Sequence, residues 1–146
     1  MKKVLSIAMV AILALSVFVG CGKSAYKDGT YKAQYSAADE HGWTEYVEVT
    51  VKDGKVTACT ADALNAAGEK KSASAEYRAS MEPVNGNYPE KFYKDIATQY
   101  VEKQSAEKMA AVAGATNSSN SIKVLLVELE KSMKEGKTDT VTVTAA

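Results

Sequence analysis

The clearest hydrophobic pattern in the first half of the chain is an alternation between residues 43 and 51. Val47, Val49 and Val51 occupy every second position there, and the residues between them are polar. Successive side chains of a strand point to opposite faces of a sheet, so this alternation predicts a half-buried strand over Trp43–Val51.

A turn and two further strands are predicted around this one. Lys52–Lys55 has Asp-Gly at its centre, a strong hairpin signal, and Val56–Ala63 returns as the antiparallel partner. Thr30–Tyr35 predicts an earlier strand, because its two tyrosines have the even spacing that places both on one face.

The second half of the chain has helical spacing instead. One apolar stripe recurs at i, i+3, i+4, i+7 and i+11 and consists of Ile122, Leu125, Leu126, Leu129 and Met133. It predicts a long amphipathic helix that is capped by Asn117, Ser118 and Ser119 and ends at Gly136.

Two earlier helices are predicted from weaker patterns. One stripe, spaced i, i+4 and i+8, consists of Phe92, Ile96 and Tyr100. It predicts a helix with Pro89 in its first turn. Ser72–Met81 is also compatible with a helix, which we expect to end at Pro83 and Gly86.

The order of these elements predicts the fold class. A last strand is expected within Thr138–Thr144, where Val141 and Val143 alternate with threonine. Strands followed by helices and then a strand are typical of an α+β fold. We therefore expect a single small domain, with a twisted antiparallel sheet packed by two or three helices.

The N-terminus has the pattern of an export signal. Two lysines follow Met1, an apolar run extends over Val4–Val19, and Gly20-Cys21 precedes the next charged residue. A Cys directly after the small residue resembles the lipobox of bacterial lipoproteins, in which this Cys receives diacylglycerol and becomes the new N-terminus. The alternative is an uncleaved anchor, although a spanning helix needs roughly 20 apolar residues.

We therefore divide the chain into three segments. Residues 1–20 are expected to be the lipoprotein signal peptide, 21–27 a lipid-anchored tether and 28–146 the folded domain. Each buried methylene of an acyl chain contributes about 0.8 kcal/mol, so two or more chains on Cys21 would hold the domain stably on the membrane. The expected location is the extracytoplasmic face of the cell membrane.

Composition narrows the possible partners and chemistry. The chain has 18 basic and 18 acidic residues and no basic tract, so nucleic acid is not an expected partner. His41 is the only histidine, so neither a catalytic group nor a metal site is expected. If Cys21 is acylated, Cys59 has no disulfide partner and is expected to be a small core residue.

A run of small residues, Val112–Ser119, lies directly before the long helix. Small residues let a ligand approach the backbone, and a helix start presents free N–H groups and a positive dipole end. The dipole alone contributes about 0.3–1 kcal/mol to binding an anion there. Thr116 adds a hydroxyl at this place. A turn of small residues can also be only a turn, so the residues alone leave both interpretations open.

Gly114-Ala115-Thr116, followed by Ser118-Ser119 and an amphipathic helix, resembles the FMN-binding domain family. That family includes covalent-flavin subunits of sodium-pumping and electron-transport complexes, and small lipoproteins of Gram-positive bacteria. Its motif reads roughly Asp, two variable residues, Ser or Thr, Gly, Ala, Thr. A flavin transferase attaches FMN to the final Thr through a phosphoester bond, and Thr116 matches that acceptor.

The resemblance to the small lipoprotein branch, the membrane-anchored immunogen-like lipoproteins, covers most of the mature chain. The similar segments are Tyr26–Tyr31, Gly42-Trp43, Val49–Val56, Glu69–Met81 and Phe92-Tyr93.

The resemblance implies an electron carrier rather than an enzyme with its own substrate. FMN would be held at Thr116, and the expected partners are a flavin transferase and a membrane electron donor or acceptor. The other implied cofactor-binding residues are Ala113, Gly114, Ala115, Asn117, Ser118 and Ser119. The candidates to cover the flavin ring are Trp43, Tyr77, Met81 and Tyr88.

Two positions depart from the family motif and leave three interpretations open. Ala110 stands where the motif has Asp, and Ala113 stands where it has Ser or Thr. The chain could carry FMN covalently on Thr116, bind a flavin reversibly at the same helix start, or have lost its cofactor. In the last case it would be a cofactor-free surface interaction or ligand-binding lipoprotein.

Overall fold

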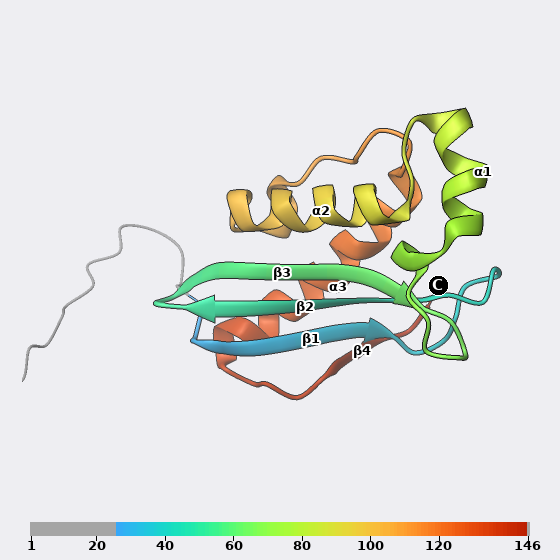
Figure 1. Ribbon diagram of the computed structural model, residues 1–146. Coiled ribbons are helices and arrows are strands. Elements are labelled where there is room, and N and C mark those ends of the chain that lie inside the picture. The colour runs from blue at the N-terminus through green and yellow to red at the C-terminus, as the bar shows by residue number, and fades with distance from the viewer. Residues whose placement is uncertain (1–25, 146) are drawn as a thin grey trace, which may run out of the picture.

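A four-stranded sheet carries two helices on one face in the computed structural model, which describes residues 26–145 (Figure 1). The strands are β1 (Gly29–Tyr35), β2 (Thr44–Lys52), β3 (Lys55–Leu64) and β4 (Val141–Val143), in the spatial order β3-β2-β1-β4. The predicted α+β class and its small single domain are confirmed.

One strand pairing differs from the wholly antiparallel sheet that we expected. β2 pairs antiparallel with both β1 and β3, whereas β4 pairs parallel with β1. The direction of β4 follows from the place where the last helix ends. The Lys27 N–H donates to the Met133 carbonyl at 2.9 Å, so the end of that helix lies beside the residues that precede β1. The chain leaves that helix beside the start of β1, so the following strand runs in the same direction as β1.

The predicted hairpin is confirmed, and its valines form the sheet side of the core. Val47, Val49 and Val51 are buried on the face that the helices cover. Asp53 and Gly54 both have positive φ, of 52° and 74°. Positive φ at both central residues is the requirement of a two-residue turn whose twist matches the flanking strands.

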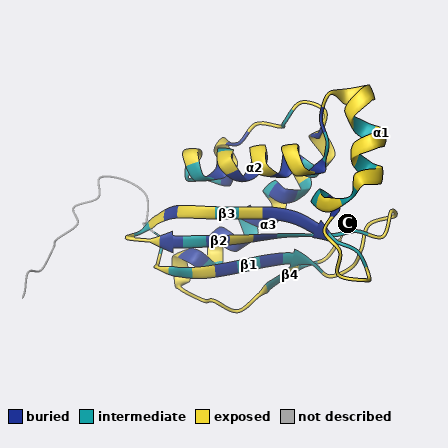
Figure 2. Ribbon diagram, in the orientation of Figure 1, coloured by how far each residue is buried: buried dark blue, intermediate teal, exposed yellow. Residues whose placement is uncertain are grey.

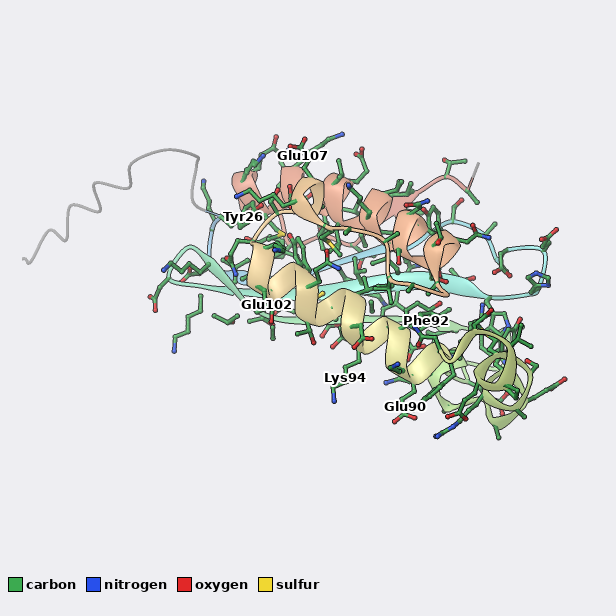
Figure 3. The ribbon with its side chains drawn as sticks, turned by 90° about the horizontal axis from the view of Figure 1, so that it is seen from above. Tyr26, Glu90, Phe92, Lys94, Glu102 and Glu107 are labelled. Atoms are coloured by element: carbon green, nitrogen blue, oxygen red, sulfur yellow. The ribbon has the colours of Figure 1, made fainter. Side chains whose placement is uncertain are left out.

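Helices α2 (Pro89–Lys103) and α3 (Thr116–Glu135) lie side by side above the sheet (Figures 1 and 3). Both predicted stripes face the core, and Figure 2 shows the inner sides buried and the outer sides exposed. Full burial of one such side chain contributes about 1.5–3 kcal/mol. The helix-side core is formed mainly by Phe92, Ile96, Tyr100, Ile122, Leu125, Leu126, Leu129 and Met133.

Helix α1 (Ala75–Asn85) projects at one end of the domain and has no buried residue (Figures 1 and 2). A 3-10 turn, η1 (Lys71–Ala73), precedes it, so the prediction that the helix starts at Ser72 was wrong. The prediction that Pro83 ends the helix was also wrong. Proline has a φ near the helical value and removes only one helical hydrogen bond, so α1 can continue through Pro83 to Asn85. Gly86 then ends the helix with a left-handed φ of 63°.

The described domain starts earlier than the predicted tether allows. The Tyr26 hydroxyl donates to the carbonyl of Gln104 at 3.2 Å, and Lys27 is bonded to the end of α3. Tyr26 and Lys27 are therefore part of the domain. The predicted signal peptide and the lipidation of Cys21 lie outside the described residues.

Candidate functional site

Thr116 is the first residue of α3 and is exposed. Ala115 precedes it as the N-cap residue, and no side chain caps this helix start. The prediction that Asn117, Ser118 and Ser119 cap the helix was therefore wrong, because all three lie inside its first turns. The first-turn N–H groups of a helix have no intrahelical acceptor, so those of Thr116, Asn117 and Ser118 remain available.

The loop before Thr116 is fixed by two buried polar side chains. The Ser119 hydroxyl accepts from the Val112 N–H at 2.9 Å and donates to the Ala115 carbonyl at 2.8 Å. The Asn87 side chain donates to the Ala113 carbonyl at 2.8 Å. Both side chains are buried. They hold the loop from two sides, so Thr116 is presented at one defined position.

Gly114 lets this loop pass close to the end of α1. Its φ is +78°, in the left-handed region that favours glycine. A Cβ atom at this position would lie 3.2 Å from the Cβ of Asn85 and 3.3 Å from the Cβ of Asn87. The glycine is therefore required both by the backbone angle and by the lack of space.

An open cleft of about 330 Å³ lies beside Thr116. Its walls come from four places in the fold, which are η1, α1, the start of α2 and the start of α3. Small ligands bind in pockets of about 300–1,000 Å³, so the cleft is at the lower end of that range. It is lined by Lys71, Met81, Asn85, Phe92, Gly114, Ala115, Thr116, Asn117 and Ser118.

Among residues 26–145, Lys71 is the only charged residue that lines this cleft, and no pattern in the sequence predicts a role for it. It is 8% exposed. Its Nζ lies 4.6 Å from the ring centre of Tyr77 and 5.8 Å from that of Trp43. The two rings pack edge to face, with their centres 5.7 Å apart. Lys-Lys pairs are usually solvated, so no local pattern distinguishes this lysine from its neighbour Lys70.

The four residues predicted to cover a flavin ring have different surroundings. Met81 lines the cleft. Trp43 and Tyr77 pack against each other over Lys71 instead. Tyr88 stacks with Arg78, whose Cζ lies 4.2 Å from the ring centre, and it does not line the cleft.

Two of the predicted cofactor-binding residues point elsewhere. The Ser119 hydroxyl is buried and used within the loop, so it does not face the cleft. Ala113 is exposed but does not line the cleft either, and Asn87 occupies its carbonyl. The structure brings Gly114, Ala115, Thr116, Asn117 and Ser118 together in the cleft wall.

A second and larger groove, of about 520 Å³, lies between β3 and α2. Cys59 lines it and is half-buried, rather than fully buried as expected. Burial raises the pKa of its thiol to about 12, so the thiol is protonated at neutral pH. Glu90 and Lys94, at the rim of the groove, project outward from α2 (Figure 3).

No family model matches the chain. The 15 kDa lipoprotein of Treponema pallidum (strain Nichols) is 35% identical over 130 residues, which cover 88% of this chain and 92% of the relative. The chain belongs to the family of that lipoprotein. This relationship supports the coarser part of the prediction, a lipoprotein anchored at a membrane. Among residues 26–145, no helix is long and apolar enough to cross a membrane.

Two solved structures resemble this lipoprotein. The crystal structure of a Clostridium perfringens protein matches with a TM-score of 0.80 and 31% identity, over 83% of this chain and 99% of that one. The solution structure of a Clostridium thermocellum protein matches with a TM-score of 0.51 and 23% identity, over 72% and 90%, and shows the fold alone. The names of these relatives do not mention a flavin.

Proposed function

We propose that this lipoprotein carries FMN on Thr116 at the extracytoplasmic face of the membrane and serves in electron transfer. The observation that carries the proposal is the position of the Thr116 side chain. It is exposed, it opens α3, and it lies in the wall of a cleft. A hydroxyl buried in the core could neither meet a transferase nor carry a cofactor.

The residues around Thr116 suit a phosphate group. The first turn of α3 has no acidic side chain and no side-chain cap. Its free N–H groups and the positive end of the helix dipole therefore favour an anion. Gly114 is exposed and forms part of the cleft wall at the same place.

The cleft also suits one side of a flat ring. Met81 and Phe92 supply apolar and polarisable surface in its wall. Bound flavin would supply transfer of one or two electrons. The chain itself would hold the phosphate end at α3 and, because the cleft is open, leave part of the ring accessible to a donor and an acceptor.

The two departures from the family motif are compensated within this loop. The Ala110 carbonyl accepts from the side-chain amide of Gln99 at 3.1 Å, and the amide oxygen of Gln99 accepts from the Ala110 N–H. Asn87 and Ser119 fix the remainder of the loop. In this chain, Gln99, Asn87 and Ser119 therefore order the loop in place of the missing carboxylate and hydroxyl.

A labelling experiment tests the proposal. The full chain is co-expressed with a flavin transferase, extracted in detergent and examined for flavin fluorescence that survives denaturing electrophoresis. We expect a fluorescent band for the wild type and for Ser118→Ala, a hydroxyl loss in the same cleft wall, and none for Thr116→Ala. A dark wild-type band under flavin-replete conditions would reject covalent attachment.

The competing function is a cofactor-free surface interaction or ligand-binding lipoprotein. Ala110 and Ala113 favour it, because they remove the carboxylate and hydroxyl that the family motif has. A colourless protein that also fails to bind added FMN would support this alternative. Colour that is lost on denaturation would instead indicate reversible flavin binding.

A further inference from the structure

Lys71 has an unusual environment for a lysine. Only 8% of its surface is exposed, although lysine is almost never buried without a partner. None of the carboxylates in residues 26–145 forms an ion pair with it, and its ammonium group has no hydrogen bond to any of these residues. A buried charge without a partner is costly, so its retention calls for a physical reason.

The exposed part of Lys71 includes its ammonium group. Every wholly enclosed side-chain nitrogen or oxygen in the described domain has a hydrogen-bond partner. The Lys71 Nζ has none, so it cannot be wholly enclosed. Lys71 also lines the cleft beside Thr116, so a positively charged side chain forms part of the wall of that cleft.

The position of Lys71 is fixed from both sides. The next residue, Ser72, donates its N–H and its hydroxyl to the buried carboxylate of Asp62, which holds η1 on β3. On the other side, the rings of Trp43 and Tyr77 face the ammonium. Cation–π contacts contribute about 0.5–2 kcal/mol, which offsets only part of the cost of burial.

In the wall of the same cleft, the first turn of α3 presents backbone N–H donors and no acidic side chain. Two independent positive features therefore line one cleft. A phosphate would receive hydrogen bonds from the helix start and would pair with the buried ammonium. None of the described residues in the cleft wall is a carboxylate that would repel an anion.

We propose that Lys71 and the first turn of α3 form a reversible binding site for the phosphate of a phosphate monoester. The site binds its ligand without a covalent bond at Thr116, and it distinguishes a phosphorylated ligand from the same ligand without phosphate. That the monoester is FMN rests on the proposed function, whereas the anion site itself does not.

Calorimetric titration of the full chain, produced without a flavin transferase and kept in detergent, tests this site. The probes are inorganic phosphate, FMN and riboflavin, which lacks the phosphate. We expect phosphate and FMN to bind and riboflavin to bind at least about tenfold more weakly than FMN. Riboflavin binding as tightly as FMN would overturn the proposal.

Variants of Lys71 test the residue itself. Lys71→Met should weaken FMN and phosphate binding by roughly thirtyfold or more, as expected when one partner of a buried charge pair is removed. Lys71→Arg should restore most of the affinity. Lys94→Met, which removes an exposed lysine on α2, should bind like the wild type. Unchanged binding by Lys71→Met would refute the assignment.

A stability measurement separates a ligand site from a structural role. Replacing a buried unpaired charge by an apolar side chain is often neutral or stabilising, so Lys71→Met should unfold at the same temperature as the wild type or higher. Phosphate should raise the unfolding temperature of the wild type only. A large loss of stability in Lys71→Met, together with unchanged phosphate stabilisation, would make Lys71 structural.

Failure of this proposal can be told from failure of the proposed function. Thr116→Ala should lose any covalent flavin but keep reversible phosphate binding within about threefold, because the N–H groups and Lys71 remain. Phosphate binding without any flavin binding would leave the anion site standing and reject the flavin function. Covalent FMN on a Lys71→Met chain, formed at the wild-type rate and extent, would reject the anion site and leave the flavin function standing.

Discussion

Replacing Gly114 by alanine would perturb the loop that presents Thr116, without removing any polar group. The new Cβ would lie 3.2 Å from the Cβ of Asn85 and 3.3 Å from the Cβ of Asn87, and the backbone would have to keep a φ of +78°. Asn87 holds the Ala113 carbonyl, so any shift that relieves the crowding also moves the loop.

The size of the effect can be worked from these two contributions. A residue with a Cβ in the left-handed conformation costs about 1–2 kcal/mol. Alanine also lowers the entropy of the unfolded chain, which returns about 0.4–1 kcal/mol. Crowding in a well-packed place adds about 1–3 kcal/mol. The expected loss in the free energy of unfolding is therefore about 2–4 kcal/mol.

Gly68 provides a matched control. Its φ is also +78°, but a Cβ there would meet no atom within 4 Å. Gly68→Ala should therefore lose only about 1 kcal/mol, the backbone part of the cost. Urea unfolding followed through the single tryptophan, Trp43, measures both variants. Equal losses for the two glycines would refute the argument that the loop is packed tightly against Asn85 and Asn87.

Three further predictions concern the core and its titrating groups. Glu130→Ala leaves the buried Ala106 N–H without its acceptor and should cost about 1–3 kcal/mol in urea unfolding, while the Tyr100 hydroxyl keeps only the weak sulfur acceptor of Met133 at 3.9 Å. Glu130→Gln keeps an oxygen acceptor for both donors and should cost less. Cys59 should resist alkylation at pH 8 in the folded protein and react at once in urea, because burial raises the pKa of its thiol to about 12. Rapid alkylation of the folded protein would contradict this. Burial raises the pKa of Tyr93 and Tyr100 above the usual value of about 10, so the folded form keeps protons that the unfolded form loses. The stability that these two groups contribute should therefore be fully present below pH 10 and should fall as the pH rises above it. Tyrosinate absorbance of these residues that appears before the protein unfolds would contradict this.

Much of the fold could be predicted because it depends on local periodicity. The valine alternation in β2 and the apolar stripe of α3 each require one buried face, and the structure supplies it. The direction of β4 could not be predicted in this way. It depends on where α3 ends relative to Lys27, which is a long-range contact that no local pattern records.

The candidate site was only partly predictable for the same reason. The exposed hydroxyl at Thr116 follows from small residues placed before a helix. Lys71 and Asn87, by contrast, are far from Thr116 in the sequence, since Lys71 follows β3 and Asn87 precedes α2. Only the tertiary fold brings them to the site. Ser119 was assigned to a cap because serine near a helix start usually serves there, but its hydroxyl ties the preceding loop instead.

The most direct test of the central claim, that Thr116 is an accessible acceptor for FMN, is peptide mass spectrometry of the chain co-expressed with a flavin transferase. We predict one added FMN, less one water, on the peptide that contains Thr116, and the same addition on Thr116→Ser. A modified peptide elsewhere, or an unmodified Thr116 peptide from cells in which the transferase labels another substrate, would contradict the account.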